Sequence, residues 1–279
     1  MLPYLWMLCG SLSFAVMGTL AHALGSTFDW QVIALARTAM ALTFAATLAV
    51  LAHVRFVFLR PRTLWVRSIA GSMSLICTFY ALTRMPVSDV LTLTNMFPIW
   101  IGILSWPVLG ERPSARVWLA VVCGVAGVVL IQQPHLAEGN FASMVALLSS
   151  FFTAVSMMGL HRLQHVDFRS VVVHFSGVSL IACICSLFLF ERSVEPPLEI
   201  DMQSLLMLLG VGLSATIGQL LLTKAFALGS PAKVSVVALT QIVFVMLIEI
   251  VVWQRTFNPT TLLGMSLVLA PTAWVMAYQ

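Results

Sequence analysis

The sequence predicts an all-α membrane protein with ten transmembrane helices arranged as two inverted five-helix repeats. Apolar residues make up 60% of the 279 residues and charged residues only 9%, a composition that indicates an integral membrane protein. Long apolar runs recur along the whole chain, as membrane-spanning helices require. The second half of the chain also resembles the first, which indicates an internal repeat.

Ten apolar runs are long enough to cross about 30 Å of hydrocarbon, which takes about 20 helical residues. Each run has to be helical, because lipid offers no hydrogen-bond partner to an exposed backbone amide. The connections are short, so no separate soluble domain is expected. The expected spans are 4–23, 31–53, 64–82, 87–108, 115–132, 141–161, 170–190, 203–228, 233–253 and 261–278.

The first run has an alternative interpretation as a secretory signal, because "AHA" at 21–23 resembles a cleavage site. Neither Lys nor Arg precedes this run, and its apolar stretch is longer than a signal core. In addition, "LCGSLSFAVMGTLAHAL" at 8–24 resembles "LLSSFFTAVSMMGLHRL" at 147–163. We therefore assign the first run to the repeat.

The clearest repeat is between "YALTRMPVSDVLTLTN" at residue 80 and "FALGSPAKVSVVALTQ" at residue 226, which lies 146 positions later. Five of the sixteen positions are identical, Tyr80 matches Phe226, and Asn95 matches Gln241. With five helices in each unit, 1–139 and 140–279, the second unit enters the membrane from the opposite side. Inverted repeats are typical of secondary transporters, which bind substrate near the midplane. A duplication with purely structural symmetry is the alternative.

The distribution of cations predicts the orientation, because short loops rich in Lys and Arg stay in the cytoplasm. Only three cations lie on the side of the odd-to-even connections: Arg84, Arg192 and Arg255. Ten lie in or beside the even-to-odd connections: Arg55, Arg60, Arg62, Arg67, Arg112, Arg116, Arg162, Arg169, Lys224 and Lys233. We therefore expect a multi-pass protein of the inner cell membrane with both termini in the cytoplasm.

The chain resembles the EamA-type ten-helix carriers of the drug/metabolite transporter superfamily over nearly its whole length. The resemblance is strongest in "FYALTRMPVSDVLTLTNMFPIW" and "LGERPSARVWLAVVCGVAGVVLIQQP", and "GQLLLTKAFALGSPAKVSVVAL" is similar to the matching segment of the second half. It implies a secondary transporter for a small organic metabolite, such as an amino acid or a related amine. One departure is that Glu111 has no acidic match in "WQRTFNPTT".

Other classes of function receive little support from the sequence. "GLSA" at 212–215 resembles an intramembrane serine nucleophile, but no histidine follows His174 to act as its base. Neither a P-loop nor a dinucleotide fingerprint occurs, so we expect no enzyme, no cofactor and no metal. The expected partners are a small-molecule substrate, the lipid bilayer and a second copy in a homodimer, but no nucleic acid. A membrane scaffold or regulatory subunit without transport activity is the alternative.

The candidate substrate site follows from depth in the membrane. Asn95 lies nine residues after Pro86 and Gln241 ten after Pro231. At about 1.5 Å per residue, both carboxamides reach roughly 14 Å into their helices, close to the midplane, from opposite sides. Carboxamides both donate and accept hydrogen bonds without the cost of a buried charge, although hydrogen bonding between helices is the alternative role. The other candidates are Ser11, Ser150, Phe14, Tyr80 and Trp100.

Four further residues are candidates for coupling or gating. Arg37 is a cation deep in the second run, where it also matches an arginine common in the family, and a structural tie to backbone carbonyls is the alternative. Lys224 lies close enough to the end of its run to reach the interface. Glu249 lies near the outer end of the ninth run, where its carboxyl could take up a proton or simply face water. Pro98 in the middle of the fourth run would bend the helix, either as a gate hinge or as simple packing curvature.

Overall fold

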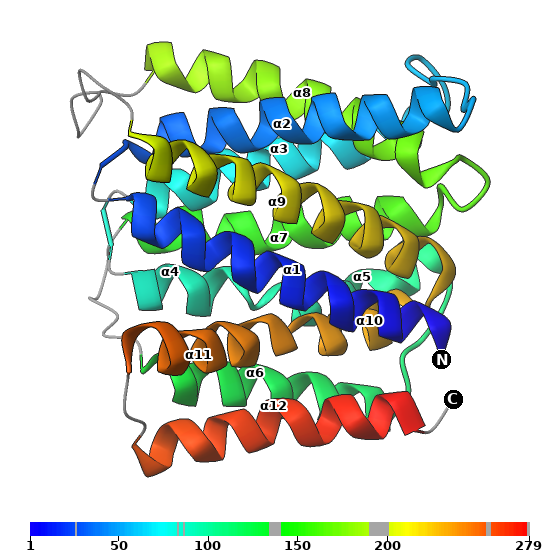
Figure 1. Ribbon diagram of the computed structural model, residues 1–279. Coiled ribbons are helices and arrows are strands. Elements are labelled where there is room, and N and C mark those ends of the chain that lie inside the picture. Colours follow the sequence, from blue (N-terminus) through cyan, green and yellow to red (C-terminus); the bar gives the residue numbers. More distant parts are fainter. Residues whose placement is uncertain are drawn as a thin grey trace.

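The chain forms a bundle of long helices that lie side by side in a computed structural model (Figure 1). The structure describes residues 1–25, 27–82, 84–85, 87–133, 141–189, 201–254 and 258–277, and all regular secondary structure in these ranges is helical. The elements are α1 (Leu2–Leu24), α2 (Trp30–Leu51), α3 (Arg62–Leu82), α4 (Val87–Thr94), α5 (Phe97–Leu104), a π-helical turn η1 (Ser105–Leu109), α6 (Ala115–Gln132), α7 (Phe141–His161), α8 (Phe168–Leu189), α9 (Met202–Leu228), α10 (Pro231–Ala238), α11 (Thr240–Trp253) and α12 (Pro259–Ala277).

The number of membrane helices agrees with the sequence. Within the described residues, nine spans are long and apolar enough to cross a membrane, and two of these combine α4, α5 and η1, and α10 and α11. The tenth long helix is α3, which has 21 residues and is made more polar by Arg62, Arg67 and several serines. The predicted all-α fold is therefore confirmed, with helix ends that differ from the expected spans by a few residues.

The helix packing relates the two halves by a pseudo-two-fold exchange. Helix α1 packs on α9, and α3 packs on α7. Exchanging the halves converts α1 into α7 and α9 into α3, so these two contacts are equivalent. The contacts of α2 with α8 and of α6 with α12 are each converted into themselves. This pattern is the one that inverted five-helix repeats predict.

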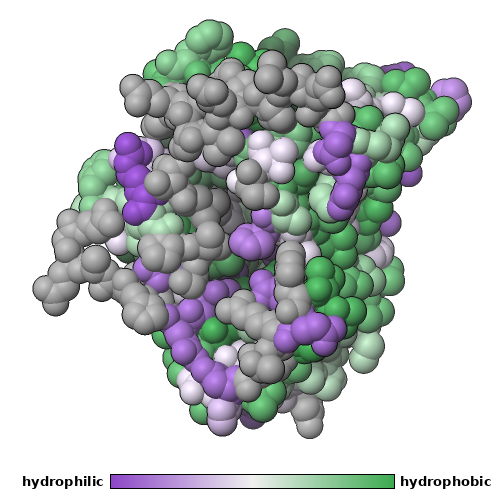
Figure 2. Space-filling model, turned by 60° about the vertical axis from the view of Figure 1, so that its left-hand side comes forward, coloured by the Kyte–Doolittle hydropathy of each residue, from purple (hydrophilic) through white to green (hydrophobic). Residues whose placement is uncertain are grey.

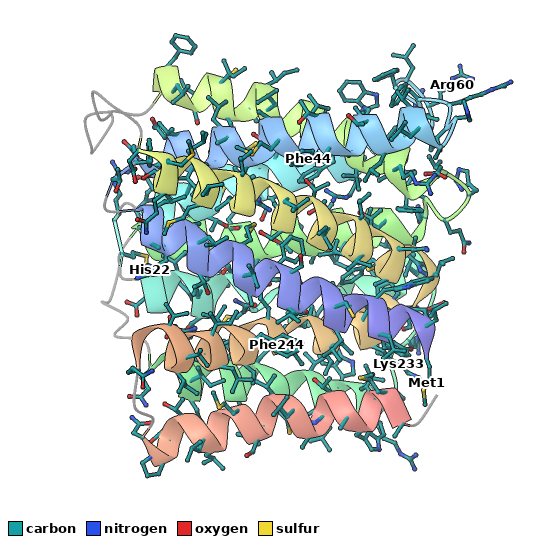
Figure 3. All side chains as sticks on the ribbon, in the orientation of Figure 1. Met1, His22, Phe44, Arg60, Lys233 and Phe244 are labelled. Carbon is teal, nitrogen blue, oxygen red and sulfur yellow. The ribbon has the colours of Figure 1, made fainter. Side chains whose placement is uncertain are left out.

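Both chain ends lie at the same end of the bundle, on the right of Figure 1, as an even number of crossings requires. Figure 3 places Met1, Arg60 and Lys233 at this end and His22 at the other. The cations of the even-to-odd connections thus gather at the end that also holds the termini.

The sides of the bundle are covered by hydrophobic side chains. In Figure 2 they form the flank of the molecule, whereas hydrophilic residues gather at the end that comes forward. Leu119, Ile181 and Phe188 are among the large side chains that are well over half exposed on this surface. Such a surface is suited to lipid contact.

Two membrane spans that were expected to be continuous are interrupted. In the first half, α4 ends at Thr94 and α5 begins at Phe97, with Pro98 in its first turn. Proline has no N–H to donate to the carbonyl four residues earlier, which explains an interruption at this position. The bend expected at Pro98 is therefore a break between two short helices.

The second half is interrupted at Leu239, between α10 and α11, without a proline. Here the backbone tightens, since the Leu239 amide donates to the Val236 carbonyl at 3.2 Å. Thr240 Oγ1 also donates to the Val237 carbonyl at 2.7 Å. Hydroxyls that bond backbone carbonyls compete with regular helix formation, and sequence periodicity alone did not reveal this break.

Proline and capping residues fix several helix starts. Pro231 begins α10, because a proline in the first turn loses no helical hydrogen bond. Pro86 lies outside the described residues. The Ser114 hydroxyl accepts a hydrogen bond from the Val117 amide at 3.4 Å at the start of α6.

Candidate functional site

A cavity of about 290 Å³ lies between the two halves of the bundle. Its wall includes residues of both halves and of both interrupted spans, and it is lined by five phenylalanine rings and by polar side chains. The rings are Phe14, Phe79, Phe97, Phe175 and Phe226. The polar residues are Arg37, Arg67, Ser74, Thr78, Thr94, Asn95, Thr153, Ser156, Gln219 and Gln241. This volume suits a small organic molecule, since pockets for such ligands begin at about 300 Å³.

Four of the residues singled out in the sequence line this cavity. Asn95 and Gln241, the matched carboxamides of the two repeats, both lie on its wall, next to the interruptions in their spans. Phe14 of α1 and Arg37 of α2 line it as well. The structure therefore brings both carboxamides, one aromatic ring and one cation to a single cavity.

Asn95 also takes part in the interruption of its own span. Its Nδ2 donates to the Leu91 carbonyl at 2.8 Å, one turn earlier in α4. Part of its hydrogen-bonding capacity is thus used to end α4. Gln241 lies in the first turn of α11 and is half-buried.

The two serine candidates are not among the described residues that line the cavity. Ser11 is fully buried and donates to the Ala238 carbonyl at 3.4 Å, at the end of α10. Ser150 accepts from Trp100 Nε1 at 2.9 Å and donates to the Leu147 carbonyl at 2.6 Å. In this structure both serines support the helices around the cavity.

Two aromatic candidates also lie away from the wall of the cavity. Trp100 is held by its bond to Ser150 and meets Phe151 edge to face, with ring centroids 5.6 Å apart. Tyr80 lies beneath the Arg84 guanidinium, whose central carbon is 4.2 Å from the centre of the ring. The preceding residue, Phe79, is the one that lines the cavity.

The remaining coupling candidates lie outside the cavity lining. The Lys224 ammonium is 4.3 Å from the Trp6 ring centre and 5.1 Å from that of Phe168, near the end of α9 that also holds the termini. Such cation–π contacts hold a lysine near the interface. Glu249 is half-buried on α11, and Pro98 is buried in the first turn of α5.

Arg67 is a cavity residue that the sequence interpretation assigned to the loop cations. It lies in α3, five residues after Arg62, and is only 1% exposed. Its Nη1 donates to Ser156 Oγ at 2.8 Å, and the Ser156 hydroxyl in turn donates to the Arg67 carbonyl at 3.0 Å. The expected span 64–82 already contained Arg67, so the position of this cation within an apolar run was the signal that could have identified it.

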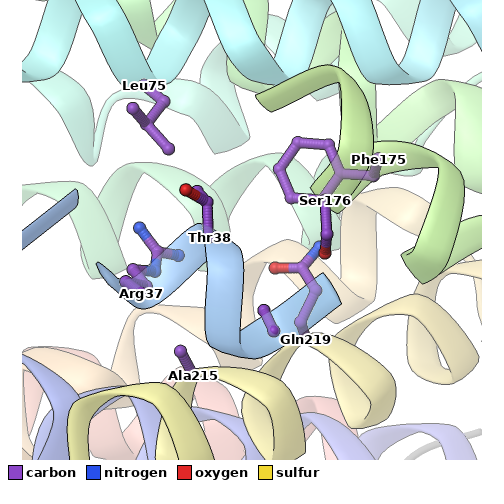
Figure 4. Close-up of a pocket in the computed structure, with 8 residues that line it drawn as sticks. Arg37, Thr38, Leu75, Phe175, Ser176, Ala215 and Gln219 are labelled. Carbon is purple, nitrogen blue, oxygen red and sulfur yellow. The ribbon is translucent and has the colours of Figure 1, made fainter. Parts of the chain in front are cut away.

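A second, much smaller hollow of about 10 Å³ adjoins Arg37, and it has room for about one water molecule. Figure 4 shows Arg37 of α2, Phe175 of α8 and Gln219 of α9 around it. All three also line the large cavity. Gln219 is 7% exposed and was not singled out in the sequence, although it is a polar residue inside an apolar run.

The wall of the large cavity is positively charged. Arg37 and Arg67 contribute two guanidinium groups, and neither Asp nor Glu is among the described residues that line it. Over the same described part of the chain, no group of three or more His, Cys, Asp or Glu residues could hold a metal ion. The arrangement suits reversible binding of a small molecule through guanidinium, carboxamide, hydroxyl and aromatic groups.

Comparison with known proteins identifies the family. Residues 1–133 and 140–277 each match the EamA-like transporter family. The pseudopaline exporter CntI of Pseudomonas aeruginosa is 27% identical over 237 residues, which cover 84% of this chain and 81% of the exporter. Solute carrier family 35 member G1 of Homo sapiens is 23% identical over 68% of this chain and 55% of its own length.

The fold also matches a solved crystal structure. That structure superposes with a TM-score of 0.85 and 18% sequence identity, over 99% of this chain and 97% of the other. The two family matches together extend over nearly the whole sequence, and the relatives are named as transporters. The protein therefore belongs to the EamA-like transporter family and is a multi-pass membrane transporter rather than an enzyme.

Proposed function

We propose that the protein is a secondary active transporter that moves a small organic metabolite, an amino acid or a related amine, across the inner membrane by alternating access. The observation that carries this proposal is the cavity of about 290 Å³ between the two halves, lined by residues of both interrupted spans. Interrupted helices near a cavity are the usual way in which secondary transporters expose polar groups to a substrate.

The two repeat units, 1–139 and 140–279, are the parts that we propose to move against each other. Residues of both units line the cavity, so a rocking motion changes access to it from either side. The Asn95 and Gln241 carboxamides bind the polar part of the substrate, and the phenylalanine rings contact its apolar part. The substrate or ion gradient drives the cycle, since the sequence contains no P-loop.

We further propose that the N and C termini lie in the cytoplasm. The cations Arg60 and Lys233 lie at the same end of the bundle as Met1 (Figure 3), and positive loops favour the cytoplasmic side. The cavity lies within one chain, so a homodimer would contain two independent transport paths.

Purified protein in liposomes tests the proposed function. Liposomes are incubated with each standard L-amino acid and with a set of primary amines, all radiolabelled, and uptake is compared with protein-free liposomes. We expect protein-dependent uptake of a subset of these compounds, reduced by Gln241→Leu. The absence of protein-dependent uptake for the whole set would favour a scaffold or regulatory subunit instead.

A further inference from the structure

The Arg67 guanidinium lies on the cavity wall and uses only part of its hydrogen-bonding capacity within the described structure. Its Nη1 is bonded to Ser156 Oγ, whereas Nε and Nη2 are buried and have no hydrogen-bond partner among the described residues. Nε and Nη2 share one edge of the planar guanidinium. This edge is the fork that binds both oxygens of a carboxylate in a bidentate pair.

The surrounding helices leave space specifically for this side chain. A Cβ on Gly71, one turn later in α3, would lie 2.6 Å from Arg67 Nη1 and 2.7 Å from the Phe175 ring. A Cβ on Gly159 of α7 would lie 3.2 Å from the Arg67 Cβ. Any larger residue at Gly71 would thus occupy the place of the guanidinium.

An aromatic ring supports the guanidinium from the side. Its central carbon is 4.0 Å from the centre of the Phe175 ring, a distance typical of a cation–π contact. Phe175 also lines the cavity and the small hollow beside Arg37. The ring therefore fixes the position of the Arg67 charge at the cavity without providing an acceptor for its N–H groups.

A buried charge of this kind is costly unless an opposite charge compensates it. Among the described residues that line the cavity, none is Asp or Glu, so the wall itself supplies no anion. A molecule bound in the cavity can supply this compensation. Arg67 is one of the residues that line the cavity, so a carboxylate bound there lies next to its side chain.

We propose that Arg67 binds a carboxylate of the transported molecule, which is therefore an amino acid or another organic acid rather than a simple amine. This inference rests on the proposed function and narrows its substrate class. The two unpaired N–H groups of Arg67 bind the two carboxylate oxygens. The second guanidinium on the wall, that of Arg37, adds to the positive potential that attracts the anion.

The test compares acids with their neutral amides as ligands of the purified protein in detergent. The probes are the standard L-amino acids, the carboxamide of each, and the monocarboxylates lactate, pyruvate and 3-phenylpropionate. The readout is the rise in the midpoint of thermal unfolding, because a ligand that binds the folded state raises this midpoint. We expect at least one acid to raise it, and the corresponding amide to bind about 100-fold more weakly.

Variants of Arg67 decide whether this discrimination arises at the proposed site. Arg67→Met removes the charge with little change in length and should abolish the preference for acid over amide. Arg67→Lys keeps the positive charge but loses the forked pair of N–H groups, so this variant should bind acids about tenfold more weakly. It also provides a test if the Met variant does not fold. Arg116→Met, at an exposed arginine of α6, is the matched control and should bind as the unchanged protein does.

Several outcomes would overturn the assignment. These are equal binding of acids and amides, an unchanged preference in both Arg67 variants, or the failure of every acid to raise the midpoint. Sodium chloride is titrated alone as well, and an Arg67-dependent rise with chloride to which no acid adds would identify an inorganic anion site instead. Uptake of amines that does not require Arg67 would leave the proposed function intact, whereas Arg67-dependent binding without uptake would refute only transport.

Discussion

The contact between α3 and α7 and the contact between α1 and α9 are equivalent under the exchange of halves, but their chemistry differs. Between α3 and α7, Ser74 Oγ lies 3.0 Å from Ser149 Oγ and 2.6 Å from Thr153 Oγ1. Between α1 and α9, the Phe14 ring lies against Gly218, where a Cβ would be 3.0 Å from the ring. The first contact is rich in hydroxyl groups, whereas the second combines close apolar packing with a bond from Ser13 Oγ to the Ser214 carbonyl at 2.9 Å.

The same asymmetry applies to the charge at the cavity. Within α3 and α9, three pairs of identical residues are separated by 147 positions: Gly71 and Gly218, Leu75 and Leu222, and Phe79 and Phe226. The same offset matches Arg67 with Ser214, whose hydroxyl donates to the Gly210 carbonyl of its own helix. Of these two equivalent helices, α3 thus contributes a buried cation to the cavity, whereas α9 has a serine at the matching position.

The comparison suggests how function is divided within the duplicated scaffold. The features shared by the two halves are an interrupted span in each half and the two equivalent close helix contacts around the cavity. Five of the polar residues that line the cavity come from α3 and α7, namely Arg67, Ser74, Thr78, Thr153 and Ser156, so we expect the substrate carboxylate to bind off the pseudo-symmetry axis.

Labelling of introduced cysteines tests the predicted orientation in the membrane and has an all-or-none outcome. In a background from which the five native cysteines are removed, Thr27→Cys should react with a membrane-impermeant thiol reagent in intact cells. Leu59→Cys, which is 79% exposed and adjoins Arg60 at the other end of the bundle (Figure 3), should react only after the membrane is permeabilised. The reverse pattern would contradict cytoplasmic termini, and reaction of both in intact cells would contradict the predicted span.

Glycine substitutions test the space at the two equivalent contacts. Gly71→Ala should lower the free energy of unfolding by about 1–3 kcal/mol, because the new methyl group overlaps Arg67 and Phe175. Gly218→Ala should lower the free energy of unfolding by less, since a Cβ there would lie no closer than 3.0 Å to the Phe14 ring. Gly18, with no atom within 4 Å of a Cβ, is the control position. Unfolding in detergent measures all three, and an equal effect of Gly71→Ala and Gly18→Ala would contradict the packing described.

The matched carboxamides should differ in effect although they occupy equivalent places. Gln241→Leu should weaken substrate binding by about 2–10-fold, the value of one neutral hydrogen bond. Asn95→Leu should weaken binding less and reduce stability more, because Asn95 Nδ2 is already bonded to the Leu91 carbonyl. Binding and thermal unfolding of the same preparations separate the two effects. Unchanged binding in both variants would leave the pair with a structural role only.

The smallest expected effect concerns the hydroxyl contacts between α3 and α7. Ser149→Ala removes its contacts with Ser74 and Thr78 and should destabilise the protein on the order of 0.6 kcal/mol, the average for hydrogen bonds between membrane helices. Ser266→Ala is the control, because this exposed hydroxyl bonds only within its own helix in the described structure. A loss of several kcal/mol at Ser149 alone would show that the hydroxyl contacts dominate the interface.

Much of the fold could be predicted because the bilayer imposes strict rules on sequence. Apolar runs of sufficient length must be helical, and matching runs in two halves of five helices must be inverted. The two carboxamides could be placed at one cavity because their depth follows from the helical rise. The interruption at Leu239 could not, since it depends on hydroxyl bonds to the backbone and not on a proline.

Two details of the site could not be predicted from the patterns that predict the fold. Counting all cations for orientation concealed Arg67, whose burial depends on the space left by Gly71 and Gly159. A single offset of 146 matched Tyr80 with Phe226, whereas the cavity is lined by Phe79 and Phe226, which are 147 apart. Pro86 and Pro231 are 145 positions apart, so the offset between the two halves changes along the chain.

Counterflow in liposomes is the measurement that tests alternating access most directly. Liposomes containing the purified protein are loaded with an unlabelled amino acid that the uptake experiment identifies, then diluted into a trace of the labelled compound. A carrier with one cavity exposed in turn to each side predicts a transient accumulation of label above its equilibrium level. A monotonic approach to equilibrium, with no overshoot at any internal concentration, would contradict alternating access through this cavity.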